Sequence, residues 1–261
     1  MWAALWSWVL LGLTGVPQAY AAVPFKVIVY PCPEYTFMVR LVDENTHTHI
    51  CSGVLVAGDM VVTTASCLRG RRFPHVTVGS GCCHDGSPPE LMKICQSRIH
   101  ESFSGSAENG GDIALLFLKK ALQHAKPITG MRSILECPSD ALSMVGWPRQ
   151  GASLAPSRCQ GVSIGFKYTT RFDCEKRLGV LPGGVVCATE RPNVIPFWDH
   201  GAALLCDDRD LVGLQTTLEG YKHFVAPRAF VHMWGFKEWI EKRGNDNSTK
   251  QYNRECSHTE L

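Results

Sequence analysis

The sequence lacks an excess of charge of either sign. It has 26 lysine and arginine residues against 24 aspartate and glutamate residues, a formal charge of +2. Nucleic acids and anionic membranes select proteins with concentrated positive charge. The one dense basic cluster, Arg69, Arg71 and Arg72, is better explained by a solvated loop than by a polyanion site. We therefore predict no nucleic-acid partner.

Long apolar runs, internal repeats and low-complexity tracts are also missing. The longest apolar stretch, from Trp2 to Val16, is shorter than the roughly 20 residues that a helix needs to cross a bilayer. It is followed by the small-residue triplet Ala19, Tyr20 and Ala21, which predicts a secretory signal peptide over residues 1–21. A buried core helix is the alternative. We expect a secreted, extracellular chain without a membrane span.

No metal-binding pattern is complete. Imidazole and thiolate groups are zinc ligands, and two short clusters contain them: His47, His49 and Cys51, and Cys82, Cys83 and His84. Neither cluster has a matching second half, so we predict no metal and no cofactor. The chain has 12 cysteines, all after the predicted signal peptide. This number is typical of disulfides in an oxidising compartment.

Helical periodicity is scarce, whereas short apolar runs broken by Gly, Pro, Asn and Asp are frequent. Examples lie at 60–65, 75–78, 113–118 and 211–214. Many short strands predict an all-β sandwich or barrel. In residues 231–243 the apolar side chains fall at helical spacing, which predicts a terminal α-helix. Residues 244–261 are polar and contain a glycosylation acceptor at Asn247.

Several motifs resemble the trypsin and chymotrypsin family. C-S-G at 51–53 and V-V-T-T-A-S-C at 61–67 resemble the family's C-G-G-x-L and V-L-T-A-A-H-C. Similar matches follow in chain order at 111–116, 146–147, 198–206 and 239–240. The resemblance implies two six-stranded antiparallel β-barrels within residues 22–243, with a cleft between them. Barrel 1 is expected at about 36–130, barrel 2 at about 135–230 and the terminal helix at 231–243.

The resemblance also implies that the catalytic residues have been exchanged. Ser66 stands at the family's histidine, His200 at its serine, and Asp112 alone matches. The mechanism needs a serine nucleophile, a histidine base and an aspartate that orients the histidine. A serine hydroxyl cannot act as a base near neutral pH. The expected proton relay is therefore broken at two of its three positions.

Other parts of the family's machinery differ as well. The oxyanion hole uses backbone N–H groups, here those of Trp198 and His200, and Trp198 replaces a glycine. In the specificity pocket, Leu218 and Arg228 replace two glycines, and Val194 falls at the floor. The pocket is therefore expected to be plugged.

Activation is expected to be lost too. In the family, a new α-amino group pairs with the aspartate before the nucleophile, which is Asp199 here. The stretch that begins at Lys26 does not match the family's cleavage site, although Lys26 stays open as a processing site. We expect Asp112 and Asp199 to be buried acids with local hydrogen bonds.

The resemblance implies three disulfides: Cys51–Cys67, Cys174–Cys187 and Cys32–Cys159. A fourth, Cys137–Cys206, is suggested between two strands of the second barrel. A fifth, Cys83–Cys95, is suggested within an insertion of the first barrel. Cys256 then pairs with Cys82 or with another molecule. The family's pocket-bracing disulfide is missing, because Pro196 replaces one of its cysteines.

Two functions compete. The first is a secreted, non-catalytic serine protease homologue whose loops bind or regulate other extracellular proteins, such as a protease, an inhibitor or a receptor. The second is a serine endopeptidase in which His200 activates Ser66 beside Asp112. A purely structural or storage role has no signature of its own in the sequence.

Overall fold

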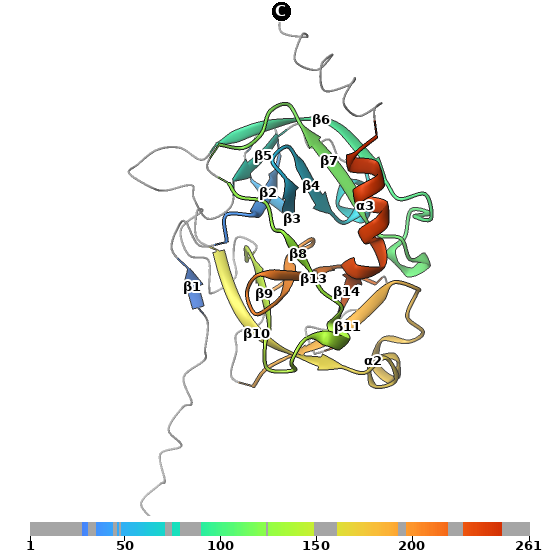
Figure 1. Ribbon diagram of the computed structural model, residues 1–261. Coiled ribbons are helices and arrows are strands. Elements are labelled where there is room, and N and C mark those ends of the chain that lie inside the picture. The colour runs from blue at the N-terminus through green and yellow to red at the C-terminus, as the bar shows by residue number, and fades with distance from the viewer. Residues whose placement is uncertain are drawn as a thin grey trace, which may run out of the picture.

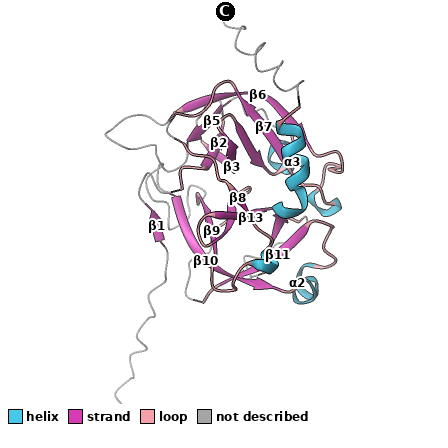
Figure 2. Cartoon of the chain, viewed as in Figure 1, coloured by secondary structure: helices cyan, strands magenta, loops and turns pink. Residues whose placement is uncertain are grey.

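The computed structural model describes residues 28–30, 35–43, 46, 48–70, 75–78, 90–123, 125–148, 161–192, 197–218 and 227–246. Strands dominate this part of the chain, which forms two stacked β-barrels (Figures 1 and 2). The predicted signal peptide, Lys26, Val194 and residues 247–261 of the predicted tail, with Asn247, lie outside the described residues. None of the described helices is long and apolar enough to span a membrane.

The first barrel is a closed ring of six antiparallel strands. In ring order these are β2 (Met38–Val42), β3 (His49–Ala57), β4 (Met60–Thr63), β7 (Ala114–Leu118), β6 (Leu91–Ile99) and β5 (His75–Val78). Alternate residues of β7 enter different cores: Leu116 and Leu118 pack inside this barrel, whereas Leu115 and Phe117 pack against the second barrel. This is the two-residue period of a strand that is buried on both faces.

The second barrel also closes through six antiparallel strands. These are β9 (Leu142–Gly146), β10 (Gly161–Thr169), β11 (Val185–Glu190), β14 (Arg228–His232), β13 (Asp210–Gln215) and β12 (Ala203–Cys206), which returns to β9. The all-β, two-barrel fold class is therefore confirmed. The sheet has two further strands that were not expected: β1 (Ile28–Tyr30) pairs with β10, and β8 (Gly130–Met131) pairs parallel with β13.

The interface between the barrels is an apolar core of its own. It includes Met38, Leu115, Trp147, Leu214 and Ile240, which come from both barrels and the terminal helix. A separate core inside the second barrel is centred on Phe166 and Phe230, whose rings pack edge to face at 5.7 Å. Three apolar cores, one inside each barrel and one between the barrels, therefore hold the elements that carry the cleft residues.

The terminal helix begins later than predicted. Helix α3 spans Lys237–Gly244 and follows the 3₁₀ helix η4 (Met233–Phe236). The expectation of a helix from residue 231 is wrong over its first residues, because Val231 and His232 pair with neighbouring strands of the second barrel. The apolar spacing of 233–240 therefore spans a 3₁₀ turn and an α-helix, both of which pack on the interface core.

The remaining helical elements are short. Helix α1 is Ala65–Leu68, η2 is Ala107–Asn109 and η3 is Ile134–Glu136. Helix α2 (Arg171–Leu178) was not predicted. Its one buried residue is Cys174, so it has no apolar stripe for a periodicity argument to detect. Thr170 caps it by accepting a hydrogen bond from the N–H of Asp173.

Three expected disulfides are present: Cys51–Cys67, Cys137–Cys206 and Cys174–Cys187. Cys137 follows η3 and is not part of a strand, whereas the sequence suggested a bridge between two strands. Cys95 is also disulfide-bonded. Its suggested partner Cys83 lies outside the described residues, as do Cys32, Cys82, Cys159 and Cys256.

Candidate functional site

Asp112 and Ser66 are held together where the two barrels meet. Asp112 precedes β7 and is 1% exposed. Its carboxylate accepts hydrogen bonds from the backbone N–H of Ser66 at 2.6 Å, the Ser66 hydroxyl at 2.8 Å and the Thr216 hydroxyl at 2.5 Å. Ser66 reaches this carboxylate because α1 starts directly after β4. The single hydroxyl proton of Ser66 is therefore donated to Asp112.

His200 lies on the loop before β12, on the other side of residues 216–217. Its Nε2 shares a hydrogen bond of 2.7 Å with the Thr217 hydroxyl, to which Trp198 Nε1 also donates at 3.3 Å. Its carbonyl oxygen accepts from the backbone N–H of Ser52 at 2.7 Å. The structure thus brings Ser66, Asp112 and His200 to one region. No hydrogen bond between described residues joins Ser66 to His200.

Asp199 is buried and bound by groups from both barrels. Its Oδ1 contacts His49 Nε2 at 2.8 Å, and its Oδ2 accepts from the Ser52 hydroxyl at 2.5 Å and from the Trp147 N–H at 2.7 Å. The Asp199 side chain is 1% exposed. These three contacts, together with burial, leave the carboxylate satisfied within the chain.

His49 and Ser52 are site residues that sequence reasoning missed. His49 was considered there only as a metal ligand, and Ser52 only as part of a motif. The available signal was Asp199 itself, because a buried carboxylate needs hydrogen-bond partners and the sequence predicted that the usual α-amino partner is missing. Gly201 lets the loop approach closely: its φ is +77°, and a Cβ there would lie 2.0 Å from the Ser52 carbonyl oxygen.

The expected pocket positions are filled with side chains. Arg228, on β14, is 2% exposed. Its guanidinium pairs with Glu190 and donates to the Phe197 carbonyl oxygen. It also lies 5.0 Å from the centre of the Trp198 ring and 5.8 Å from that of Phe166. No motif in the sequence predicted Glu190 as the partner of Arg228.

Leu218 is buried as well. It packs in a small apolar cluster with Leu181, Val185 and Ala229, around the Cys174–Cys187 disulfide. The side chains at both expected pocket positions, Leu218 and Arg228, are thus part of the packed interior. Within the described residues, no cluster of three or more His, Cys, Asp or Glu side chains could hold a metal ion.

Comparison with known proteins agrees with the resemblance. The family model described as Trypsin matches residues 28–240, which is most of the chain. The chain belongs to the trypsin family. Rat granzyme M is 28% identical over 220 residues, covering 79% of this chain and 83% of its own length. Trypsin alpha of Drosophila melanogaster is 25% identical over 210 residues, covering 77% of this chain and 80% of its own length.

The trypsin family includes relatives without activity. The inactive serine protease scarface of Drosophila melanogaster is 25% identical over 194 residues, which is 72% of this chain. The match covers only 28% of the length of scarface. Among solved structures, mouse neuropsin aligns with a TM-score of 0.64 at 22% identity, and covers 81% of this chain and 95% of its own. Human heparin binding protein aligns with a TM-score of 0.66 at 17% identity, over 85% of this chain and 97% of its own. These structures support the fold.

Proposed function

We propose that this chain is a secreted, non-catalytic member of the trypsin family that binds or regulates other extracellular proteins. The observation that carries the proposal is the hydrogen bond from Ser66 Oγ to Asp112, with His200 hydrogen-bonded to Thr217 instead. A serine nucleophile must donate its proton to a base that is hydrogen-bonded to it. In this arrangement the base position is a serine that serves as a donor, and the nucleophile position is a histidine.

Asp199 supports the proposal independently. An activating α-amino group would have to displace His49 and Ser52 from a buried carboxylate. Arg228 adds a second argument, since its guanidinium lies between aromatic rings where a substrate side chain would need space. Catalysis depends on orienting the substrate, and a filled pocket removes that orientation. The existence of an inactive relative is consistent with this reading.

The second candidate function is an endopeptidase that uses Ser66, His200 and Asp112 in exchanged roles. It is favoured only by the proximity of the three residues: Thr216 donates to Asp112, which also accepts from Ser66, and the neighbouring Thr217 is hydrogen-bonded to His200. Ser66 lies beside Asp112, and the backbone donors expected to form an oxyanion hole belong to the loop of Trp198 and His200. The expected nucleophile and its electrostatic stabilisation are therefore on different elements.

Hydrolysis of peptide and ester substrates by the intact secreted protein tests both candidates. The proposal predicts rates equal to those of buffer, and no covalent labelling by a serine-directed probe. Turnover that purifies with the protein and disappears in Ser66→Ala would establish the endopeptidase instead. Affinity capture from the native fluid, with the heat-unfolded protein as control, would then identify the partner, which we expect to be a protease, an inhibitor or a receptor.

Secretion is part of the proposal. It rests on the signal-like segment at 1–21 and on the disulfides of the described chain. Passage through the secretory pathway exposes the acceptor at Asn247 to glycosylation. We expect the mass of the secreted protein to fall on treatment with an N-glycosidase, and Asn247→Gln to remove that difference. An unchanged mass in both would show that Asn247 carries no glycan.

A further inference from the structure

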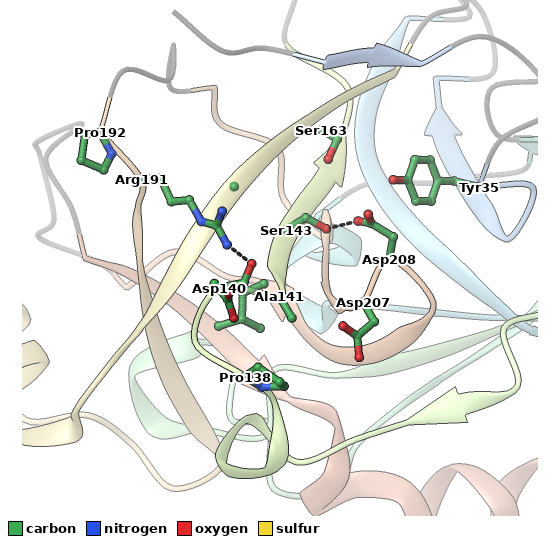
Figure 3. Close-up of a pocket in the computed structure, with 12 residues that line it drawn as sticks. Tyr35, Pro138, Asp140, Ala141, Ser143, Ser163, Arg191, Pro192, Asp207 and Asp208 are labelled. Carbon is green, nitrogen blue, oxygen red and sulfur yellow. Dashed lines mark hydrogen bonds between the residues drawn. The ribbon is translucent and has the colours of Figure 1, made fainter.

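A pocket of about 610 Å³ lies on the second barrel and shares none of its lining residues with the triad positions. Its walls come from strands β9 and β10, the turn between β12 and β13, and the segment around Tyr35 (Figure 3). Pockets of this size accept small ligands or single side chains of a partner.

The pocket walls are acidic. Asp140, Asp207 and Asp208 line the pocket, and Arg191 is the one positively charged residue among the described residues that line it. The Arg191 guanidinium donates to two carbonyl oxygens, those of Phe166 and Asp140, and forms no ion pair with a described carboxylate. Asp207 is paired with Arg132 at 3.3 Å. Asp140 and Asp208 have no cationic partner among the described residues, which leaves the pocket with unbalanced negative charge.

The backbone presents these carboxylates in a fixed way. Asp207 and Asp208 have φ of 52° and 58°, and the N–H of Arg209 closes the turn onto the Cys206 carbonyl oxygen. Aspartate is one of the few residues other than glycine that readily adopt this left-handed conformation. The Ser143 hydroxyl donates to Asp208 Oδ1 at 2.5 Å. This bond fixes one Asp208 oxygen and leaves the other to receive a donor from a ligand.

A second observation points to a ligand. Ser163 lines the pocket, is only 6% exposed, and its side chain has no hydrogen bond among the described residues. Figure 3 shows its hydroxyl directed toward Ser143 and the pocket. Polar side chains of largely buried residues are normally hydrogen-bonded, and the partner of this hydroxyl has to come from the pocket. Its hydroxyl oxygen can accept a further hydrogen bond.

We propose that this pocket binds a lysine or arginine side chain of a partner protein. This proposal rests on the proposed partner-binding function. Lysine offers three N–H donors and arginine five. Asp140, Asp208 and Ser163 provide the acceptors, and the Tyr35 ring provides a surface for the alkyl part of the side chain. An acidic side chain would meet the unbalanced carboxylates and is excluded by repulsion.

Titration of the intact ¹⁵N-labelled protein tests this, with N-acetyl-arginine amide and N-acetyl-lysine amide as probes. We expect saturable shifts of the backbone amides of Ser143, Ser163 and Asp208. Asp208→Asn should weaken binding by about twofold to fivefold, the size of one solvent-exposed charge pair. It keeps the side-chain shape and tolerates the left-handed backbone. Glu238→Gln, the matched loss of an exposed carboxylate on α3, should leave binding unchanged.

N-acetyl-glutamate amide and calcium chloride serve as competing probes. Tighter binding of either one at these amides would overturn the proposal, as would shifts with the basic probes that are confined to other regions or unaffected by Asp208→Asn. If the basic probes do not bind and the chain hydrolyses no substrate, the proposed binding in the pocket is refuted and the proposed function is not. Substrate hydrolysis by the chain refutes the proposed function, whatever the pocket binds.

Discussion

Arg228 carries a buried positive charge that depends on the carboxylate of Glu190. The two side chains are 2% and 12% exposed. Removal of one partner from a buried ion pair leaves an uncompensated charge and costs about 3–5 kcal/mol. We predict that Glu190→Ala lowers the free energy of unfolding by about 3 kcal/mol, as measured by urea denaturation followed by tryptophan fluorescence.

Two further variants make this prediction specific to the charge. Glu238→Ala removes an exposed carboxylate and should change stability by less than about 0.5 kcal/mol. The double variant Glu190→Leu with Arg228→Met removes both charges and should lose less stability than Glu190→Ala. If Glu190→Ala behaves like the control, Arg228 is not held as described.

His232 predicts a dependence of stability on pH. Burial lowers its pKa from the ordinary value of 6.5, because desolvation disfavours the charged ring. Its Nε2 accepts the N–H of Ile134 at 3.2 Å, a bond that requires the neutral form. Since the folded pKa is below the unfolded one, the unfolded chain binds the proton first. This contribution to stability is present above about pH 6.5 and lost as the pH falls below it.

The measurement is the urea midpoint between about pH 7 and pH 5 for the natural chain and His232→Gln. The decline on acidification should be shallower in the variant, since glutamine takes up no proton. Identical slopes would mean that His232 does not couple protonation to folding.

At the scale of residues, the sequence predicted which positions depart from the family's motifs, but not which side chains contact them. Ser66 and His200 follow from motif spacing. Asp112 and Asp199 are buried and hydrogen-bonded, as expected for retained acids. The contacts of Asp199 with His49 and Ser52 could not be predicted, because they join segments about 150 residues apart and depend on how the barrels dock.

At the scale of elements, strands were predictable where apolar runs are bounded by polar residues. The expected runs at 75–78 and 211–214 correspond to β5 and the centre of β13. Helix α2 was not predictable, since hydrogen bonds at its cap and the ion pair of Arg171 with Glu175 support a surface that is almost entirely polar. The start of the terminal helix was misplaced because strand pairing overrides helical spacing at Val231.

The Cys174–Cys187 disulfide should matter most for α2, whose one buried residue it anchors. The bonded residues are 13 apart in sequence, a loop whose closure contributes about 3 kcal/mol. We predict that Cys174→Ala with Cys187→Ala lowers the unfolding free energy by about that amount. Amide hydrogen exchange should rise first in α2. Phe172→Ala, an exposed change on the same helix, is the control; equal exchange in both variants would show that the disulfide does not anchor α2.

At the scale of the whole molecule, the cleft is formed by the docking of two barrels, each with its own core. The interface core and the hydrogen bonds from Ser52 to His200 and Asp199 connect them. The two-barrel fold could be predicted from sequence, whereas the exchange of the triad residues stays a prediction. The contacts that fill the expected pocket and those that bind Asp199 depend on how the barrels dock. No local sequence pattern encodes that docking.

The proposed function implies that inactivity belongs to the whole cleft and not to two side chains. Its most direct test is the double variant Ser66→His with His200→Ser, expressed with an engineered cleavage site before Val27 and measured for labelling by a serine-directed inhibitor and for peptide hydrolysis. Loss of one oxyanion-hole donor alone reduces rates about a hundredfold to a thousandfold. Trp198, Arg228 and the occupied Asp199 remain in this variant. We predict neither labelling nor saturable hydrolysis above the unmodified chain; rapid labelling with saturable hydrolysis would contradict the account.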